Sequence, residues 1–178
     1  QDGVTFYFVD NEYYFGRNYI YGHACNDEAE RFAFFSKAVL DCLPHIGFFP
    51  DVLHAHDWQA AMAVALLKLQ YNCLADYARV RTLFTIHNLR YQGVFDWPFV
   101  SELLSLSGGL FNQDYIEYYG KANFMKAALV MADAVTTVSP SYASEIQSSG
   151  YGETLDGVLR ARGRVSGILN GLDEALYD

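Results

Sequence analysis

The stretch DVLHAHDWQAAMAVALL, residues 51–67, contains in one run the pattern that decides the fold. Residues 51–55 are a short apolar run typical of a buried strand, and Asp57 follows at the start of an apolar sequence with helical spacing. Two further short, β-prone runs, residues 81–86 and 134–138, repeat the strand signal. Short strands that alternate with helices predict an α/β fold, namely a Rossmann-like parallel sheet with helices on both faces.

The residues before this core predict three further elements. Residues 4–9 (VTFYFV) are β-prone and predict a strand, whereas the Tyr-, Gly- and Asn-rich residues 11–26 predict an irregular surface loop. Asp27, with Glu30 three residues later, predicts the start of a helix. Pro44 is expected to end that helix.

The residues after the second strand predict a long connection and then a return to the sheet. Residues 87–114 are too long for a plain connector, which predicts a functional loop. A helix is expected over residues 115–131, and Ser139-Pro140 predicts the start of another, with serine as the cap and proline in the first turn. A last strand is expected over residues 165–169.

The composition limits the classes of function. A chain of 178 residues that is 52% hydrophobic can build one packed domain. Its net charge of −9 argues against nucleic acid or an anionic membrane as partner, because both require a basic face; a neutral polymer or a small polar molecule fits better. Cys25, Cys42 and Cys73 form no CxxC motif, and no signal peptide or membrane span is present, so a reducing, cytoplasmic setting is favoured.

Polar side chains follow every strand of the predicted sheet at its carboxyl end. In open parallel sheets, ligands bind at that edge, so these side chains are the first candidates for a functional site. The candidates are His56, Asp57, Trp58, His87, Asn88, Ser139 and Asn170.

Three histidines allow a metal-site alternative. His54 and His56 point the same way on a strand and, with His87 or Asp57, could ligate zinc or iron. The residues after Asp57 do not complete the metallohydrolase pattern H-x-H-x-D-H, so ligand number and type both fall short. The structural alternative makes His54 a buried, hydrogen-bonded strand histidine.

The other candidates also have structural explanations. Asp57 could serve as a helix N-cap, worth about 1 kcal/mol, as well as contact a substrate. Trp58 could be a core aromatic or an exposed platform for a sugar. His87 could be an ordinary satisfied histidine, and Asn170-Gly171 is first of all a turn signal.

Four segments, taken together, resemble the bacterial glycogen synthases and plant starch synthases in order and spacing. The likeness covers nearly the whole chain from about Tyr19 onward, and four segments in register are far more specific than any one of them. The segments are DVLHAHDWQAA (51–61), TLFTIHNLRYQGVF (82–95), FMKAALVMADAVTTVSPSYASEI (124–146) and SGILNGLD (166–173).

This resemblance implies a two-domain GT-B fold and a retaining transfer of glucose from ADP-glucose to the non-reducing end of an α-1,4-glucan, with no metal and no cofactor. It implies His87 and Asp57 as catalytic residues, His87 meeting the donor glucose. It also implies a set of substrate-binding residues, comprising Tyr21, Trp58, Asn88, Gln92 and Asn170.

The same resemblance implies that residues 1–178 are part of the N-terminal, acceptor-side domain of a longer enzyme. The family's glycine-rich K-T-G-G-L-x-D segment is absent from this sequence, as is the C-terminal nucleotide-binding domain with its diphosphate-binding Arg and Lys and its Glu. We therefore expect these 178 residues to be inactive alone.

Other functions stay open at this point. Another GT-B enzyme could use UDP-glucose or make sucrose or trehalose, because donor choice depends on the other domain. A noncatalytic carbohydrate-binding module would need a sandwich of strands, and a His-ligated hydrolase would need zinc or iron. Glycogen and starch are not distinguished either, so a plastid replaces the cytoplasm if the source is a plant.

Overall fold

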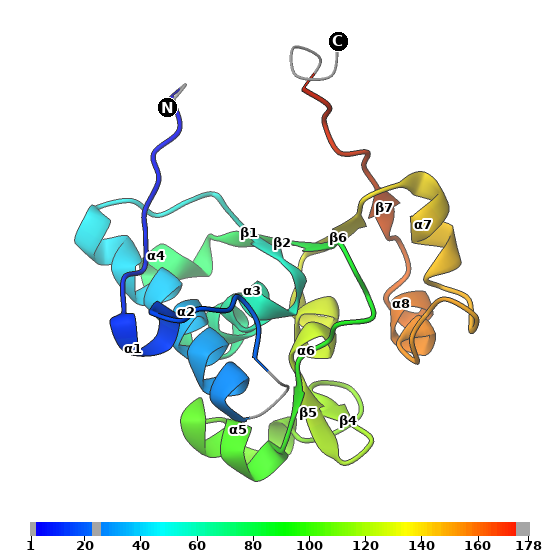
Figure 1. Cartoon of the computed structure of the whole chain (residues 1–178), viewed down its shortest axis with the longest axis horizontal. Helices are drawn as coiled ribbons and strands as arrows, with labels where there is room; N and C mark the ends of the chain where they lie inside the picture. Colours follow the sequence, from blue (N-terminus) through cyan, green and yellow to red (C-terminus); the bar gives the residue numbers. More distant parts are fainter. Residues whose placement is uncertain (1–2, 23–25, 174–178) are drawn as a thin grey trace.

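A four-stranded parallel sheet organises the computed structural model, which describes residues 3–22 and 26–173. Its strand order is β1-β2-β6-β7 (Figure 1), which confirms the α/β fold with a Rossmann-like parallel sheet. Adjacent strands align in register, with Ala55 beside Phe84 and Phe84 beside Val135. The strands are β1 (Val52–His56), β2 (Arg81–Ile86), β6 (Ala134–Thr137) and β7 (Ser166–Gly167).

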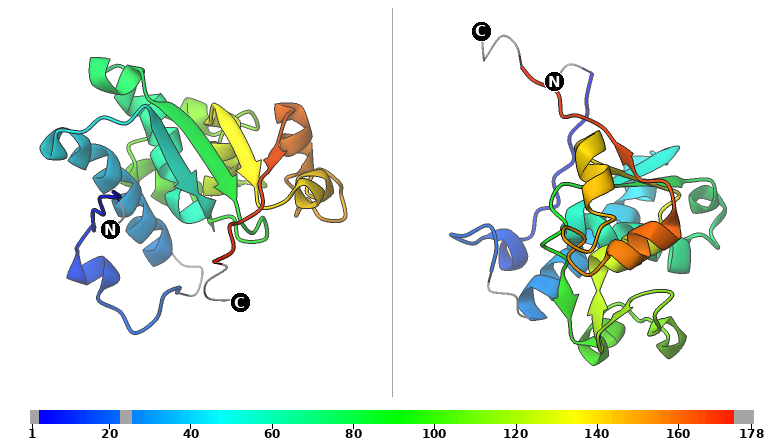
Figure 2. Two further views of the ribbon diagram at one scale, coloured as in Figure 1. Left: turned by 90° about the horizontal axis from the view of Figure 1, so that it is seen from above. Right: turned by 90° about the vertical axis from the view of Figure 1, so that its right-hand side faces the viewer.

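One face of this sheet carries the helical layer. Helices α3 (Asp57–Leu66) and α6 (Phe124–Met131) pack against each other, and α2 (Asn26–Ile46) packs against α3. The strands are added in one direction, so right-handed crossovers place α3 and α6 on the same side, as Figure 2 (left) shows. Phe84 and Val135 are buried beneath them.

The opposite face of β1 and β2 is open in the part of the chain that the structure describes. Side chains alternate along a strand, so Val52 and His54 point to this face, and both are exposed. The helices expected on this second face are not among the described residues. The open face lies between the two rising ends of the chain in Figure 1.

Smaller elements surround the sheet. A second, antiparallel sheet has the order β3-β5-β4 and lies beyond α6. The remaining elements are α1 (Glu12–Phe15), a π-helical turn (Leu67–Tyr71), α4 (Ala75–Ala78), β3 (Val94–Phe95), α5 (Trp97–Leu103), a 3₁₀ turn (Gly108–Leu110), β4 (Glu117–Tyr118), β5 (Lys121–Asn123), α7 (Pro140–Glu145) and α8 (Asp156–Arg162). Among the described residues, no helix is long and apolar enough to cross a membrane.

The predicted strand over residues 4–9 is wrong. This segment is extended but belongs to no sheet, and Phe8 is 88% exposed. β-propensity becomes a strand only where a neighbouring strand accepts its main-chain hydrogen bonds. The adjacent loop prediction was incomplete as well, because Asn11 accepts a hydrogen bond from the Tyr14 N–H and caps α1.

The predicted helix over residues 115–131 is correct only in its second half. The first half is a β4–β5 hairpin, turning at Tyr119 and Gly120, both at positive φ (49° and 81°). Two successive positive φ values define the tight turn that hairpins prefer, and this turn chemistry overrides the apolar spacing. Asn123 then caps α6 by accepting a hydrogen bond from the Lys126 N–H.

The start and the end of α2 also differ from the prediction. Helix α2 begins at Asn26, so Asp27 lies in its first turn and pairs with Arg17 instead of capping. Pro44 lies inside the helix; it cannot donate to the Leu40 carbonyl, which instead accepts the Tyr77 hydroxyl at 2.8 Å.

The long connection over residues 87–114 contains β3 and α5, so it is a structured insertion and no plain loop. The last strand, β7, is shorter than the predicted residues 165–169.

Cys42 and Cys73 are free thiols, whereas Cys25 lies outside the described residues.

Asp133, in the turn before β6, ties the helical layer to the sheet. Its carboxylate accepts hydrogen bonds from Lys68 Nζ (2.7 Å) and from the N–H and hydroxyl of Thr82 (2.7 and 3.0 Å). Burial alone would raise the pKa of this carboxyl, but the bonds from Lys68 and Thr82 outweigh it and lower the pKa to about 2.

We expect Asp133→Asn to destabilise the protein only above acid pH. Because the folded pKa lies below the unfolded value of about 3.9, the ionised carboxylate stabilises at neutral pH, and this contribution disappears as pH falls toward 2. After discounting for solvent screening, the difference in unfolding free energy should be about 1–2 kcal/mol at pH 7. Urea unfolding at pH 7 and at about pH 2 measures this difference in unfolding free energy, and Asp76→Asn in α4 serves as the control. An equal loss at both pH values would contradict the expectation.

Candidate active site at the carboxyl ends of the strands

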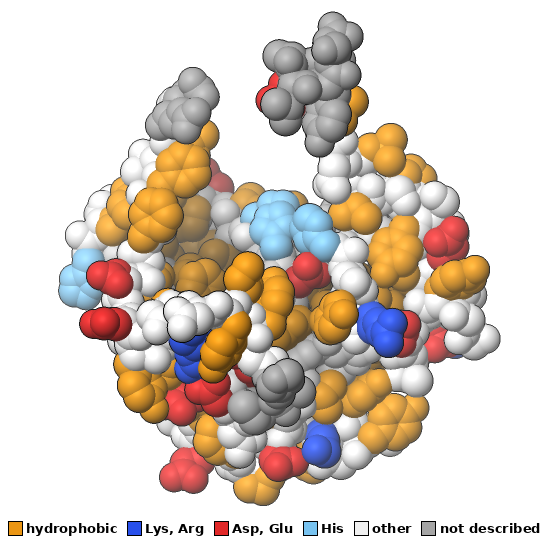
Figure 3. Space-filling view, viewed as in Figure 1, with side chains coloured by type: hydrophobic (Ala, Val, Ile, Leu, Met, Phe, Trp, Pro, Cys, Tyr) orange, Lys and Arg blue, Asp and Glu red, His pale blue; other side chains and the backbone are white. Residues whose placement is uncertain are grey.

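The carboxyl ends of β1 and β2 bring two histidines into contact. His56 is the last residue of β1 and pairs in register with Thr85, so the chain leaving β2 places His87 beside it. His56 Nδ1 and His87 Nε2 are 2.9 Å apart and share a hydrogen bond. Figure 3 shows histidine rings gathered at the surface on this part of the molecule. The structure therefore confirms that the carboxyl ends of these strands meet at one edge of the sheet. We call this edge the rim; its residues are 56–58, 87–88 and 139.

Asp57 holds the main chain of the same loop. Its carboxylate accepts hydrogen bonds from the backbone N–H groups of His87 (2.8 Å) and Asn88 (3.3 Å). The prediction of Asp57 as N-cap is wrong: the cap position is His56, whose side chain makes no capping hydrogen bond. Asp57 has a φ of 54°, and this left-handed conformation turns its carboxylate toward β2 instead of into its own helix.

The neighbouring His54 belongs to a polar ladder on the open face of the sheet. His54 Nε2 lies 2.6 Å from Thr85 Oγ1, which lies 2.6 Å from Thr136 Oγ1. His54 is hydrogen-bonded as expected but exposed instead of buried, because no described helix covers this face. Partial loss of hydration, and then the nearby histidines, lower the pKa of both His54 and His56, which favours neutral rings at pH 7.

The metal-site alternative finds no geometric support in these rings. The His56 and His87 nitrogens face each other, and His54 Nε2 faces Thr85. No group of three His, Cys, Asp or Glu side chains suited to a metal occurs among the residues that the structure describes.

Trp58 lies beneath the rim and not on it. Its side chain is 8% exposed and packs edge-on against Phe32, with ring centroids 4.9 Å apart, and beside Phe95 at 5.7 Å. An exposed sugar platform is therefore incorrect for Trp58 in this structure. The ring is a core aromatic because its position in the first turn of α3 faces α2 and the second sheet.

Gln92 is likewise internal. Its Oε1 accepts from Asn123 Nδ2 at 2.6 Å, and its Nε2 donates to the Glu153 carbonyl at 2.9 Å. With both ends of the amide engaged and 8% exposure, Gln92 joins the loop after β2 to β5 instead of lining a pocket. In this structure Gln92 supports the loop from below, and its part in shaping a substrate pocket stays a prediction.

Gly93 makes the approach between this loop and Trp58 possible, so we expect Gly93→Ala to be strongly destabilising. Its φ is +66°, and an added Cβ would lie 2.4 Å from Trp58 Cε3. The backbone strain and the displaced indole together should cost about 2–3 kcal/mol of unfolding free energy. Chemical denaturation measures the loss. The matched change Gly157→Ala, in α8 with nothing within 4 Å, should be neutral or stabilising. Equal effects of the two changes would contradict this account.

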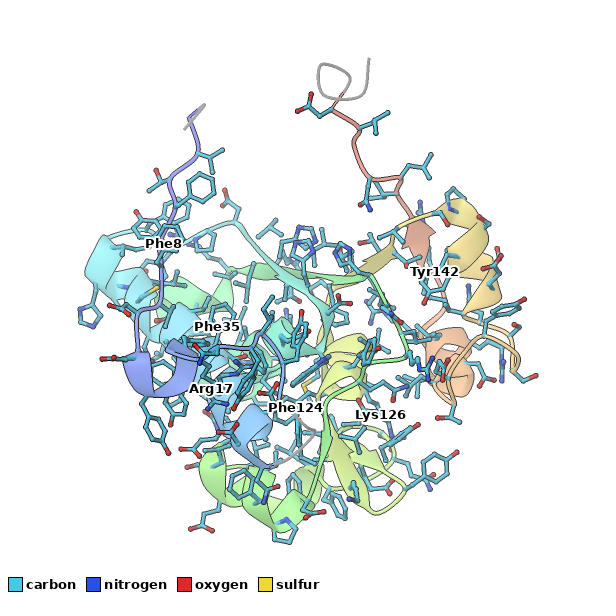
Figure 4. The ribbon with its side chains drawn as sticks, viewed as in Figure 1. Phe8, Arg17, Phe35, Phe124, Lys126 and Tyr142 are labelled. Atoms are coloured by element: carbon cyan, nitrogen blue, oxygen red, sulfur yellow. The ribbon has the colours of Figure 1, made fainter. Side chains whose placement is uncertain are left out.

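Tyr21 lies at the site and Asn88 lies on the loop that Asp57 holds, whereas Asn170 contacts neither among the described residues. Tyr21 is 62% exposed and lines a cleft of about 790 Å³ that also includes His56 and Asp57. Arg17 and Phe35 also line this cleft, and Figure 4 shows them near each other on the side of the molecule formed by α1 and α2. Asn88 is exposed on the loop, and its Oδ1 accepts from the Arg90 N–H at 3.1 Å.

Asn170 lies on the segment after β7 that leads away from the sheet (Figure 1). Its side chain makes no hydrogen bond to any residue that the structure describes, and it is exposed. The contact of this asparagine with the site stays a prediction.

Tyr142, on α7 (Figure 4), is a contact that the sequence did not suggest. Its hydroxyl accepts a hydrogen bond from the Leu89 N–H at 3.2 Å, so α7 supports the loop that carries His87. Ser139 caps this helix as predicted, by accepting from the Tyr142 N–H at 3.0 Å. The sequence did contain a signal for this contact, because Tyr142 lies three residues after Ser139, the predicted helix cap at the rim.

Strand order and register together define a Rossmann-like α/β domain, and the candidate ligand-binding edge of such a domain lies at the carboxyl ends of β1, β2 and β6. The chain belongs to the family described as the starch synthase catalytic domain, whose family model matches residues 1–161.

Curated relatives agree with this family. Glycogen synthases from Anoxybacillus flavithermus and Geobacillus stearothermophilus are 52% and 53% identical over 178 residues, covering 99% of this chain and 36% of theirs. One from Bacillus cereus (strain ATCC 10987 / NRS 248) is 49% identical over 179 residues, 37% of its length. The chain thus spans about a third of the length of these relatives.

A solved structure shows the same fold. It is the catalytic domain of starch synthase IV from Arabidopsis thaliana, bound to ADP and acarbose. The likeness has a TM-score of 0.79 at 32% identity and covers 93% of this chain and 34% of that one.

Proposed function

We propose that this chain is the acceptor-side part of a glycogen synthase, which transfers glucose from ADP-glucose to the non-reducing end of an α-1,4-glucan with retention. The observation that carries the proposal is the rim itself. Asp57 holds the backbone of the loop that presents His87, and His87 meets His56 beside the 790 Å³ cleft. Relatives named glycogen synthase and a structural neighbour bound to ADP and acarbose support the donor and acceptor classes.

The chemistry of the rim suits glycosyl transfer. A departing glucosyl group develops positive charge at its ring, so neutral hydrogen-bond partners should hold its hydroxyls, and His87 is placed to be one. A retaining glycosidase instead needs two carboxyl groups about 5–5.5 Å apart. Of the rim residues 56–58, 87–88 and 139, only Asp57 carries a carboxylate, and two backbone N–H groups occupy it. These features support transfer without a covalent enzyme intermediate.

The proposal assigns residues 1–178 to the N-terminal domain of a longer, cytoplasmic enzyme that uses neither metal nor cofactor. The 36% coverage of the relatives supports the assignment to part of a longer protein. The cations that hold the donor diphosphate would then come from the rest of the polypeptide. The net charge of −9 suits a neutral glucan better than a polyanion.

Release of ADP by the full-length enzyme tests the function. ADP-glucose should yield ADP rapidly only when glycogen is present, and UDP-glucose should be a poorer donor. Equal or better turnover of UDP-glucose would favour another retaining GT-B glycosyltransferase. Activity that requires added zinc and needs no sugar nucleotide would overturn the proposal in favour of a hydrolase.

A further inference from the structure

His56 makes a contact that the proposed chemistry does not use. It occupies the last position of β1, next to Asp57 in the chain, and its ring bonds to the ring of His87. Residues 56 and 57 therefore hold the same neighbour in two ways: Asp57 binds the backbone of His87 at 2.8 Å, and His56 binds its imidazole at 2.9 Å.

We propose that His56 is the positioning residue of the site, which fixes the ring orientation and the tautomer of His87. This inference rests on the proposed function for its kinetic consequence. The shared bond engages His87 Nε2, which leaves Nδ1 as the ring nitrogen that can face a sugar hydroxyl. A backbone anchor alone would leave rotation of the His87 side chain unrestrained, because the ring turns about two single bonds.

The bond between the rings also couples their protons. Between two neutral imidazoles, one nitrogen must donate and the other must accept, so the tautomer of His56 sets that of His87. If both rings were protonated, neither could accept and the bond would be lost. The groups facing His56 are His54, His87 and Asp57; burial and the two histidines lower the pKa of His56, which keeps an acceptor available at neutral pH.

His56 is itself held in place. The ring centroids of His54 and His56 are 4.1 Å apart, and the two ring planes are inclined by 38°. His54 is hydrogen-bonded to Thr85 on the neighbouring strand, β2. Thr85 in turn contacts Thr136 on β6. The ring that orients His87 therefore rests on a ladder of side chains that crosses three strands, and a rigid support of this kind is what a positioning residue requires.

Substitutions by amides of different length separate this role from a merely structural one. The amide of asparagine occupies roughly the place of histidine Nδ1, and the longer glutamine reaches the place of Nε2. His56 uses Nδ1, so in the full-length enzyme His56→Asn should retain kcat within about threefold. His56→Gln and His56→Phe should lower kcat about tenfold, the effect of one lost hydrogen bond, with little change in the KM for glycogen.

His45 supplies a control outside the site. It lies exposed in the last turn of α2 and belongs to no contact of the His54–His56–His87 group, so His45→Gln should leave kcat unchanged. A structural role for His56 would predict equal losses in the asparagine and glutamine variants, with parallel losses of thermal stability. That outcome, or wild-type kcat in His56→Phe, overturns the inference.

A second readout does not depend on activity. In histidine-¹⁵N spectra of the enzyme, the ring signals of His87, identified by their loss in His87→Ala, should shift in His56→Phe and stay in place in His45→Gln. Unchanged His87 signals in His56→Phe overturn the inference whether or not the enzyme makes glycogen. A wild-type enzyme that releases no ADP, together with the expected shift, overturns the proposed function alone.

Discussion

His87→Ala in the full-length enzyme should reduce glycogen-dependent ADP release by about 10²–10³-fold, the cost of removing one preorganised donor to a transition state. The expectation depends on where His87 lies. It follows β2 directly, its backbone is tied to Asp57, and its exposed ring contacts His56, which lines the cleft. The loss should fall on kcat more than on the KM for ADP-glucose, because the contact strengthens as the glucosyl group departs.

The control for this experiment is another histidine. His45 lies exposed in the last turn of α2, which leads into the amino end of β1, the opposite end from the rim, so His45→Ala should leave ADP release unchanged. Thermal unfolding should be similar for both variants, because His87 is exposed and contributes little to the core. Wild-type kcat in His87→Ala would remove His87 from the site and redirect the search to the residues that line the cleft.

Asp57→Ala should lower kcat by about 10–100-fold, for a different reason. Two backbone N–H groups would lose a charged acceptor, at about 1.5–3 kcal/mol for each bond to a charged group, and the loop carrying His87 and Asn88 would no longer be fixed. Alanine also tolerates the φ of 54° less well than aspartate does. The change should therefore lower both activity and stability.

Asparagine at this position separates positioning from acid–base chemistry. Asp57→Asn keeps an oxygen acceptor and tolerates a positive φ, so it should retain activity within about tenfold if Asp57 acts by holding the loop. A loss as severe as that of Asp57→Ala would instead show that the negative charge itself is required. Initial rates over pH 5–9 for the two variants would complete the comparison.

The sequence predicted the sheet because its strands are short, apolar and separated by helices. It placed β2 at its exact bounds and β1 within one residue, and it identified the rim from the residues that follow them. Those signals are local: a buried strand must be apolar whatever surrounds it, and the cap at Ser139 needs only the next three residues. Residues 4–9 show the limit, since a strand signal there gave an extended segment that joins neither sheet formed by the described residues.

The roles of individual rim residues required the fold. Asp57 has the sequence of a helix cap, yet its carboxylate binds a loop 30 residues away, because its φ and the adjacent strand end decide where it points. Trp58 and Gln92 stand in the right segments but are buried, because α2 and β5 cover them. The sequence by itself determined which residue types reach the ends of the strands. Only the tertiary structure decided which side chains face the cleft and which support it, because side-chain direction depends on contacts between residues far apart in the chain.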